Sequence, residues 1–426
     1  MARKKIREYD AKRLICQHIP KYSNNQINIP LQTILITPET NLSTLPKLHL
    51  WLSRNKLVAK PDQLFGKRKK YNLVLLNATY DETKKWIQKH MNKEVTIGKA
   101  TDKLTHFIIE PFQPHQEEFY LSITSQRETD TILFSTQGGM DIEERWDSIK
   151  TITIPTLDSI QAEQINTILP KELSKEKKQT IINFIKAIHQ IYINLNFSSL
   201  EINPFALDQN NQILLLDLVA EIDDCALFKN QKEWGDLEFP TPFGKKISPE
   251  EAYIEKIDQD SGASLKLTIL NPQGRIWNIL FGGGASVIYL DTFVAQGMGL
   301  ELANYGEYSG ATTEESYQYV KTVLKLMTKK PHPKGKVLVI AGAIANFTDI
   351  EKTFKGIIQA LKEYKVQLQK GKISIIVRRG GPNDQKGLEL MKQAGIELNI
   401  PMDVFGPETP MTAIVPLAIK KIRNEK

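Results

Sequence analysis

Cysteine and long apolar runs are scarce in this sequence. Its 426 residues include only two cysteines, Cys16 and Cys225, which match neither metal-ligand spacing nor a disulfide framework. No apolar run approaches the length that spans a bilayer, and the N-terminal MARKKIREYDAKRL lacks the apolar core of a signal peptide. We therefore expect a protein of the reducing cytoplasm that does not bind membranes.

A strong excess of one charge is also absent. Lysine and arginine number 56 against 49 aspartates and glutamates, and the net charge of +7 is dispersed along the chain. The basic run 66–70 is short and has no interleaved aromatics, so we interpret it as solvated surface and expect no nucleic-acid partner. Attraction of anionic substrates is the alternative.

The chain is long enough for two or three domains, and a proline- and glycine-rich connector indicates where it divides. The segment WGDLEFPTPFGKK, residues 234–246, has no periodicity, so we place one domain at residues 1–243 and the other at 244–426. Soon afterwards, the sequence SPEE from Ser248 has the composition of a helix start.

Four short motifs in the second domain carry most of the information. Strand-like runs precede three of them, namely WNILF, KVLVIAGAI and ISIIV, and amphipathic segments follow. Strand, glycine turn and helix in repeated order predict a parallel sheet whose carboxyl edge collects helix N-termini. The motifs are GGGAS at 282–286, YSGA at 308–311, ANFT at 345–348 and RRGGPN at 378–383.

The same edge is predicted to bind an anion. Helix N-termini offer free N–H groups and partial positive charge, and Arg379 adds a bidentate fork just after ISIIV. A polyanionic small molecule is therefore expected there. Three alternatives stay open: tight turns without a ligand, a structural salt bridge for Arg379, and a capping role for Thr348, because TDIE also fits a capping box.

The first domain mixes predicted strands and helices without regular alternation. The predicted strands are LVAKP, YNLVLLN, THFIIEPF, EFYLSIT, TILFST and QILLLDLVA. One amphipathic helix begins after Ser174. His189 lies off the apolar stripe of that helix, so we expect a surface histidine with no chemistry.

Scattered residues of this domain suggest a nucleotide site, although no GxxxxGK[ST] phosphate loop occurs. Lys60 ends an apolar segment, and the basic run follows it, so that together they could hold phosphates. Glu201, Asn203 and Asp217 lie in the predicted strand ends LEINP and LLLDL and offer hard oxygen ligands, which suit magnesium with ATP. A solvated lysine turn and a pair of capped strand ends are the alternatives.

These sequences together resemble the ATP-citrate lyase family. KPDQL, GKAT, IEPF, EEFY and LEINP resemble its ATP-grasp half, while WGDLEFP, SGASLKL, FGGGASV, ELANYGEYSGA, IANFT, FKGI and VRRGGPN resemble the citrate-binding domain that follows. The resemblance covers nearly the whole chain in order, and the length is that of the smaller subunit of the two-subunit form. More distantly, the pattern is similar to the β subunit of succinyl-CoA synthetase.

The resemblance implies an α/β fold, with an ATP-grasp domain of α+β type followed by a flavodoxin-like or Rossmann-like parallel-sheet domain of the CoA-ligase type. It also implies the chemistry. ATP phosphorylates a histidine, and the phosphoryl group passes to citrate. CoA then displaces phosphate to give citryl-CoA, and cleavage yields acetyl-CoA and oxaloacetate.

Site residues carry over from the family onto the matching positions. ATP contacts are implied for Lys60, Arg68, Lys69, Pro111, Gln113 and Glu118, with Mg²⁺ held by Asn203 and Asp217 and a second metal position at Asp258, Ser261 and Ala263. Citrate contacts are implied for Gly283, Gly284, Ala285, Ser286, Ser309, Gly310, Asn346, Phe347, Thr348, Tyr364 and Arg379.

Two departures from the family pattern matter. Lys69 occupies a glycine position of the family's lid, where a positive backbone torsion would strain lysine unless Gly66 supplies the flexibility. No histidine sits in the glycine-rich setting of the family's phosphohistidine, so we expect no catalytic residue in this chain. The seven histidines are His18, His49, His90, His106, His115, His189 and His332.

The resemblance therefore implies a larger partner subunit in a hetero-oligomer. That subunit, with a part like the α subunit of succinyl-CoA synthetase and a citrate-synthase-like lyase domain, would supply the histidine, most of the CoA site and the cleavage step. Alone, the chain is expected to be inactive. Two other functions stay open: the large subunit of citryl-CoA synthetase, and a catalytically silent subunit that senses citrate or nucleotide, which only Lys69 supports.

Overall fold

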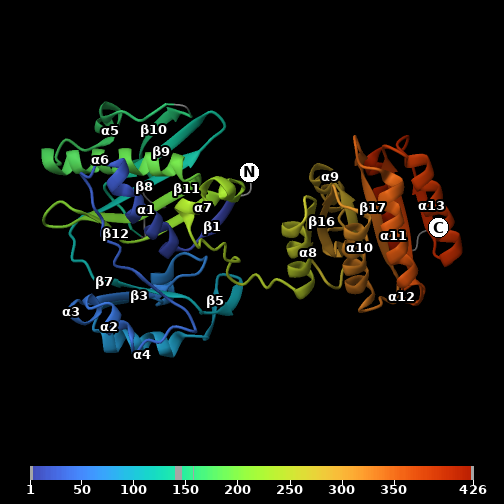
Figure 1. Cartoon of the computed structure of the whole chain (residues 1–426), viewed down its shortest axis with the longest axis horizontal. Coiled ribbons are helices and arrows are strands. Elements are labelled where there is room, and N and C mark those ends of the chain that lie inside the picture. The colour runs from blue at the N-terminus through green and yellow to red at the C-terminus, as the bar shows by residue number, and fades with distance from the viewer. Residues whose placement is uncertain (1–2, 140–145, 157, 424–426) are drawn as a thin grey trace. The chain divides into compact units, whose positions relative to one another are not determined.

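The chain forms two compact units, Met1–Lys246 and Ile247–Lys426. The computed structural model describes nearly all of both, namely residues 3–139, 146–156 and 158–423. Within these described ranges, no helix is both long and apolar enough to cross a membrane. The unit boundary lies in the extended segment between α7 (Leu227–Trp234) and α8 (Pro249–Asp260) (Figure 1).

A large antiparallel sheet forms the core of the first unit. Its strand order is β1-β13-β11-β8-β9-β10, and β12 pairs with the end of β11. Helices α1 and α6 pack on each other and on this sheet. The bounds are β1 Arg3–Ile6, β8 Glu118–Ser125, β9 Thr129–Ser135, β10 Lys150–Pro155, β11 Phe197–Leu207, β12 Ile213–Leu215, β13 Leu218–Asp223, α1 Glu8–Tyr22, α5 Ala162–Ile168 and α6 Lys175–Asn194.

A smaller antiparallel sheet, ordered β2-β7-β3-β4, forms the lower part of this unit in Figure 1 together with α2, α3 and α4. It has a hydrophobic core of its own, and β5 pairs with β6 as a separate hairpin. The bounds are β2 Ile34–Ile36, β3 Leu57–Pro61, β4 Leu75–Ala78, β5 Glu94–Ile97, β6 Ala100–Lys103, β7 Phe107–Pro111, α2 Leu45–Leu48, α3 Trp51–Arg54 and α4 Tyr80–His90.

Most predicted elements of this unit are confirmed, but of YNLVLLN only the last three residues lie in β4, and the segments near the proposed metal ligands also differ. LVAKP is the whole of β3, and Ser174 caps α6. QILLLDLVA is not one strand, because the chain leaves the ladder at Leu216 and Asp217 and so divides into β12 and β13. LEINP is not a strand end either. It lies in the middle of β11, whose register against β8 shifts after Ile202.

His189 is fully buried, contrary to the expectation of a surface histidine. Its Nε2 lies 3.2 Å from Asp130 Oδ2, while Asp130 Oδ1 accepts a hydrogen bond from Ser125 at 2.7 Å. Burial lowers the pKa of His189, although Asp130 opposes the shift. The prediction failed because α6 is covered by the large sheet and also by α1, so its buried face is wider than one apolar stripe.

A mostly parallel sheet forms the core of the second unit, as predicted. Its order is β14-β16-β15-β17-β18-β19, in which the neighbours from β16 to β19 are parallel and the edge strand β14 is antiparallel. This is the flavodoxin-like order with one added edge strand. The bounds are β14 Ser264–Ile269, β15 Ile276–Phe281, β16 Asn304–Ser309, β17 Lys336–Ile344, β18 Ile373–Gly380 and β19 Met402–Phe405.

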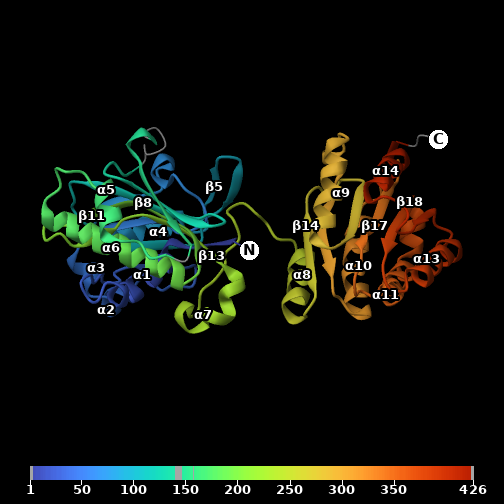
Figure 2. The ribbon, with the colours of Figure 1, turned by 90° about the horizontal axis from the view of Figure 1, so that it is seen from above.

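Helices cover both faces of this sheet. Figure 2 shows α9 and α14 on one face and α8, α10, α11 and α13 on the other, in agreement with two separate hydrophobic clusters. The helix start predicted at Ser248 is confirmed, with a capping box that begins α8, and Thr312 forms a capping box at the start of α10. The remaining bounds are α9 Gly283–Ala295, α10 Thr313–Thr328, α11 Ile350–Glu363, α12 Lys365–Lys370, α13 Asp384–Leu398 and α14 Ile414–Arg423.

Thr348 does not cap α11, which corrects one of the alternatives left open for it. The N-cap is Asp349, whose Oδ1 accepts a hydrogen bond from the Lys352 N–H at 3.0 Å. Aspartate is as good a cap as threonine, and the helix begins one residue later than the TDIE pattern indicated. The helix therefore does not use the Thr348 hydroxyl.

Candidate functional site

The parallel sheet has a topological switch point between β15 and β17. After β15 the chain pairs β16 on one side and then crosses to β17 on the other side. Register brings the strand ends together, because Phe281 of β15 is paired with Tyr308 of β16 and with Gly342 of β17. Open α/β sheets bind ligands at this position, outside the carboxyl ends of the strands.

Arg379, near the end of β18, is buried at this switch point with only 5% of its surface exposed. Its Cζ lies 4.6 Å from the centroid of the Phe281 ring, and its Nη1 donates to the Ala343 carbonyl. Gly342 leaves room for it, since a Cβ there would lie 2.6 Å from Nη1. The Nε of Arg379 has no hydrogen-bond partner among the described residues.

The charge of Arg379 is poorly compensated. Burial, and next the charge of Arg378, lower the pKa of Arg379 to about 10. No carboxylate in the described ranges forms an ion pair with Arg379, so the structural salt bridge considered above is not present there. Arg378 differs, because its guanidinium donates to three backbone carbonyls, those of Gly342, Pro407 and Thr409. Arg378 is thus structural, whereas Arg379 suits an anionic ligand.

Helix α9 begins at the same edge of the sheet. Gly282 has a φ of 87°, which favours glycine, and its N–H donates to the Tyr308 carbonyl at 3.0 Å. The helical ladder starts where the Ser286 N–H donates to the Gly282 carbonyl. The N–H groups of Gly283 and Gly284 precede this ladder, so they are the ones that an anion can accept from.

The structure corrects two predicted contacts in this turn. Ala285 packs in a hydrophobic cluster, and Ser286 is fully buried with its hydroxyl donating to the Gly282 carbonyl at 3.0 Å. Glu307, which the sequence analysis did not identify, lies beside the turn, since a Cβ on Gly283 would be 2.9 Å from its Oε1. Its negative charge would repel an anion on that side of the turn.

The loop between β17 and α11 lies next to Arg379. The Ala345 N–H donates to the Gly380 carbonyl at 2.8 Å, which ties the loop to the end of β18. Asn346 and Phe347 are exposed there, and Thr348 is half-buried. Three of the predicted citrate contacts therefore lie in a loop that is joined to the strand end carrying Arg379.

Ser309 and Gly310 lie at the same edge, directly after the Tyr308 position that pairs with Phe281. Gly310 has a φ of 68°, and a side chain there would meet only Ala263, at 3.9 Å. The turn is open, so a ligand has room to approach its backbone.

Tyr364 is not brought to this edge, which corrects its predicted contact with citrate. It follows the last residue of α11, a helix of 14 residues, so it lies about 20 Å along the helix axis from Ile350. Because α11 returns the chain to the start of the parallel strand β18, Tyr364 lies near the amino edge of the sheet. Its ring is packed against the cluster formed by α10, α11 and α13.

In the first unit, Lys60 and Arg68 meet Asp217 between the two sheets. Lys60 lies in β3 of the small sheet, and its Nζ is 4.0 Å from Asp217 Oδ1. Arg68 opens a short 3₁₀ turn, and its Nη2 lies 2.5 Å from the same oxygen. The predicted phosphate-binding cations and the predicted metal ligand are therefore in one place.

Asn203 lies beside Asp217, because the Asn203 N–H donates to the Asp217 carbonyl at 3.0 Å. Among the described residues, the donors to the Asp217 carboxylate all contact Oδ1, so Oδ2 is the atom available to a cation. The Asp217 side chain is 39% exposed, and an amide oxygen and a carboxylate oxygen are ligands that Mg²⁺ accepts. These residues fit magnesium.

Glu118 and Gln113 belong to the same neighbourhood. The Gly139 N–H donates to Asn203 Oδ1 at 2.7 Å, and a Cβ on this glycine would lie 2.7 Å from Glu118 Oε2. Glu118 Oε1 lies 3.1 Å from His115 Nε2, whose ring contacts the Gln113 carbonyl at 2.8 Å. Pro111 ends β7 two residues before Gln113.

The carboxylate of the second predicted metal position is already paired in this structure. Asp258 Oδ1 accepts a hydrogen bond from the Leu265 N–H at 2.7 Å, and Oδ2 lies 2.5 Å from Lys266 Nζ. The Ser261 hydroxyl accepts from the Ala263 N–H at 3.2 Å. A cation held by Asp258 would have to displace the exposed Lys266, and the second metal position stays a prediction.

Three charged residues at the nucleotide side were missed by the sequence analysis, namely Glu8, Lys12 and Glu110. Lys12 Nζ lies 2.8 Å from Glu8 Oε1 and 2.6 Å from Glu110 Oε1. Glu8 and Lys12 are spaced four apart on one helix, which is typical of an exposed ion pair, yet both side chains are only 2% exposed. No sequence signal distinguishes such a pair from a solvated one.

Lys69 is not strained, which corrects the concern raised by its position in the lid. It is exposed, and among the described residues of this lid the positive φ belongs to Lys67, at 59°, rather than to Lys69 or Gly66. The loop conformation therefore does not require glycine at position 69.

We expect Lys69→Gly to leave the fold intact and to change ATP affinity by no more than about tenfold, or about 1.4 kcal/mol. The lysine carries charge near the phosphates but no backbone strain that glycine would relieve. Calorimetric titration with ATP measures this, with Lys70→Gly as the matched exposed control. A much larger gain in affinity would show that the natural lid is defective and would favour the silent sensing subunit.

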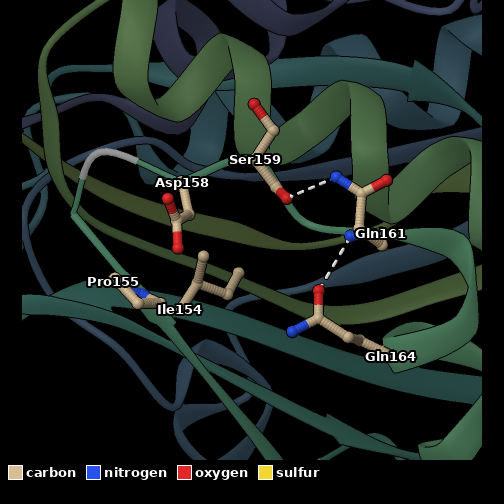
Figure 3. Close-up of a pocket in the computed structure, with 6 residues that line it drawn as sticks. All are labelled: Ile154, Pro155, Asp158, Ser159, Gln161 and Gln164. Atoms are coloured by element: carbon tan, nitrogen blue, oxygen red, sulfur yellow. Dashed lines mark hydrogen bonds between the residues drawn. The ribbon is translucent and has the colours of Figure 1, made fainter.

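A shallow pocket between the end of β10 and the start of α5 lies outside this neighbourhood (Figure 3). The Gln161 N–H donates to the Gln164 side chain at 2.9 Å, and the Gln161 side chain donates to the Ser159 carbonyl at 2.8 Å. None of the predicted site residues lines it. Its lining residues are Ile154, Pro155, Asp158, Ser159, Gln161 and Gln164.

A cluster of paired charges between two antiparallel sheets, followed by a flavodoxin-like sheet with a buried arginine at its switch point, is typical of a two-domain ligase-type enzyme. Comparison of the chain with known protein families agrees with this assignment to the ligase-type enzymes. The ATP-citrate synthase ATP-grasp domain matches residues 2–234, and the ATP citrate lyase citrate-binding domain matches residues 245–421. The chain belongs to the ATP-citrate synthase family, which is also named ATP citrate lyase.

Individual relatives support this assignment over the full length. The ATP-citrate synthase alpha chain protein 2 of Arabidopsis thaliana is 48% identical, with 99% of each chain covered. The human ATP-citrate synthase is 44% identical over 98% of this chain, which spans only 38% of the human protein. The ATP citrate lyase of Methanothrix soehngenii, solved with citrate and coenzyme A, is 47% identical with a TM-score of 0.88, covering 98% of this chain and all of that chain.

Proposed function

We propose that this chain is the ATP- and citrate-binding subunit of a hetero-oligomeric, cytoplasmic ATP citrate lyase. The observation that carries the proposal is the buried Arg379 guanidinium, whose Nε is unpartnered among the described residues, at the switch point of the sheet. A carboxylate of citrate would accept two parallel hydrogen bonds from it. The N–H groups of Gly283 and Gly284 and the Thr348 hydroxyl would hold the other oxygens.

The first unit would bind the nucleotide. Lys60 and Arg68 would contact the phosphates, the segment from Pro111 to Gln113 the adenine, and Glu118 the ribose. Asn203 and Asp217 would hold Mg²⁺, which neutralises charge on the phosphoryl group when it is bound. These roles are supported by the contacts that bring the residues together between the two sheets.

The reaction would require a partner subunit. The γ-phosphoryl group of ATP would pass to a histidine nitrogen of the partner, leaving ADP, and then to a carboxylate oxygen of citrate. The CoA thiol would attack that acyl phosphate and release phosphate, and citryl-CoA would then be cleaved to acetyl-CoA and oxaloacetate. The Arabidopsis thaliana relative is named an alpha chain and is covered over 99% of its length, which supports placing the remaining steps on another polypeptide.

Co-purification with the partner subunit, followed by assay for products, tests this function. ATP- and citrate-dependent formation of acetyl-CoA by the complex, with neither subunit active alone, is the expected result. Accumulation of citryl-CoA without acetyl-CoA would instead identify a citryl-CoA synthetase. Absence of ATP binding by the purified chain would contradict the catalytic assignment.

A further inference from the structure

Six charged side chains form a cluster between the two sheets of the first unit. Three are cations and three are carboxylates, so their formal charges sum to zero. All except Asp217 are nearly buried, with side-chain exposures of 2–12%, whereas that of Asp217 is 39%. The members are Glu8, Lys12, Lys60, Arg68, Glu110 and Asp217.

Glu8 is the carboxylate that contacts all three cations of this cluster. Its Oε1 lies 2.8 Å from Lys12 Nζ and 2.7 Å from Lys60 Nζ, and its Oε2 lies 2.7 Å from Arg68 Nη2. Although burial opposes the effect, these cations hold the pKa of Glu8 well below its usual range. The side chain is therefore a buried anion around which the cations are arranged.

The backbone of Glu8 is fixed as well. The Glu8 and Tyr9 N–H groups donate to the two oxygens of Asp62 at 2.9 and 3.0 Å, which holds the start of α1 against β3. Glu8 thus reaches the cluster from a rigid helix start.

Arg68 is shared between two carboxylates. The same nitrogen, Nη2, donates to Asp217 Oδ1 and lies 2.7 Å from Glu8 Oε2, an ion pair by distance that does not meet hydrogen-bond geometry, while Nη1 donates to the Pro61 carbonyl at 2.9 Å. When Asp217 turns toward a metal ion, Glu8 and Pro61 still hold Arg68 in place. Without the Glu8 charge, Asp217 would be the one carboxylate among the described residues still within ion-pair distance of Arg68, with Asp62 acting from farther away, and Asp217 would be drawn more strongly into that pair.

We propose that Glu8 is a positioning residue of the nucleotide site, which holds Arg68 so that Asp217 is free to bind the metal ion that accompanies ATP. The inference rests on the proposed ATP-binding function. The start of α1 would thus contribute to the nucleotide site by positioning Arg68, a role distinct from binding phosphate and from binding metal. Glu8 itself touches neither the nucleotide nor the metal.

The test is the Mg²⁺ dependence of ATP binding in the full chain, measured by calorimetry at stepped Mg²⁺ concentrations. We expect Glu8→Gln, which is isosteric, to raise the Mg²⁺ concentration of half-maximal effect by about 5- to 50-fold, the usual range for coupled sites. A purely structural role would lower the fraction of competent protein without moving this midpoint.

Glu110→Gln is the matched control. It removes the same charge from the same cluster, but Glu110 contacts Lys12, Lys60 and Thr33 rather than Arg68. We expect its midpoint to stay within about threefold of the wild type. Equal shifts in the two variants would show a general field effect and would overturn the inference.

A double variant keeps the inference testable if Glu8→Gln alone does not fold. Combining Glu8→Gln with Arg68→Gln restores a neutral cluster, and with Arg68 removed Asp217 no longer depends on Glu8. The double variant should therefore have the same Mg²⁺ midpoint as Arg68→Gln alone. A further shift on adding Glu8→Gln would refute the inference, whereas a wild-type chain that binds no ATP would refute the proposed function as well.

Discussion

Replacing Asp217 by asparagine is expected to reduce phosphorylation of the partner subunit's histidine by about 100- to 10,000-fold. Citrate binding, in the other unit, should persist. Asp217 has a partly exposed side chain beside Asn203, and asparagine keeps the shape of that side chain while removing the charge that favours a cation. Rapid-quench measurement of phosphohistidine in the assembled complex gives the rate.

The same variant separates two roles of Asp217, because this residue also pairs with Arg68. If Asp217 contributed to ATP binding only through its ion pair with Arg68, then Asp217→Asn would free Arg68. The Mg²⁺ dependence of ATP binding would stay unchanged. Asp224→Asn, directly after β13 and away from the cluster, is the charge-matched control. Phosphorylation at the wild-type rate in Asp217→Asn would remove this residue from the metal site.

The parallel sheet and its ligand edge could be predicted from sequence because local signals repeat there. WNILF, KVLVIAGAI and ISIIV became β15, β17 and β18, and Arg379 lies where the end of ISIIV placed it. Strand and turn preferences act over a few residues, so each motif predicted its own element. The shared switch point then followed from the topology of parallel sheets.

The nucleotide cluster could be predicted only in part. Lys60 in β3, Asn203 in β11 and Asp217 between β12 and β13 all belong to apolar runs that the sequence marks, but Glu8 and Lys12 resemble any exposed helix pair spaced by four. Their burial depends on β3 and on the chain between β12 and β13, which are far away in sequence. The structure departs from the predicted surface position of His189 and from the predicted citrate contact of Tyr364 for a related reason. Which face of a helix is covered, and how far its end lies from a site, are set by tertiary packing.

Arg379→Ala is expected to weaken citrate binding by about 30- to 1000-fold, or about 2–4 kcal/mol, while ATP binding in the first unit stays nearly unchanged. The guanidinium is buried and poorly compensated, with its pKa lowered to about 10 by burial and next by Arg378. The guanidinium is still charged at neutral pH, and an anion would supply the counter-charge that its buried site lacks. Calorimetric titration of the full chain with citrate measures the loss.

Two further variants show whether citrate affinity depends on the bidentate geometry of the Arg379 guanidinium or only on its charge. Arg379→Lys should recover only part of the affinity, since a point charge cannot reproduce two parallel hydrogen bonds. Arg275→Ala removes the same charge from the same unit but at the amino edge of the sheet, where Arg275 pairs with Glu301, so citrate affinity should not change. Because Gly342 makes room for the Arg379 guanidinium, the alanine variant leaves a gap rather than a clash, and thermal unfolding confirms that the fold survives. Wild-type citrate affinity in a folded Arg379→Ala chain would place the anion site elsewhere and assign Arg379 a structural role.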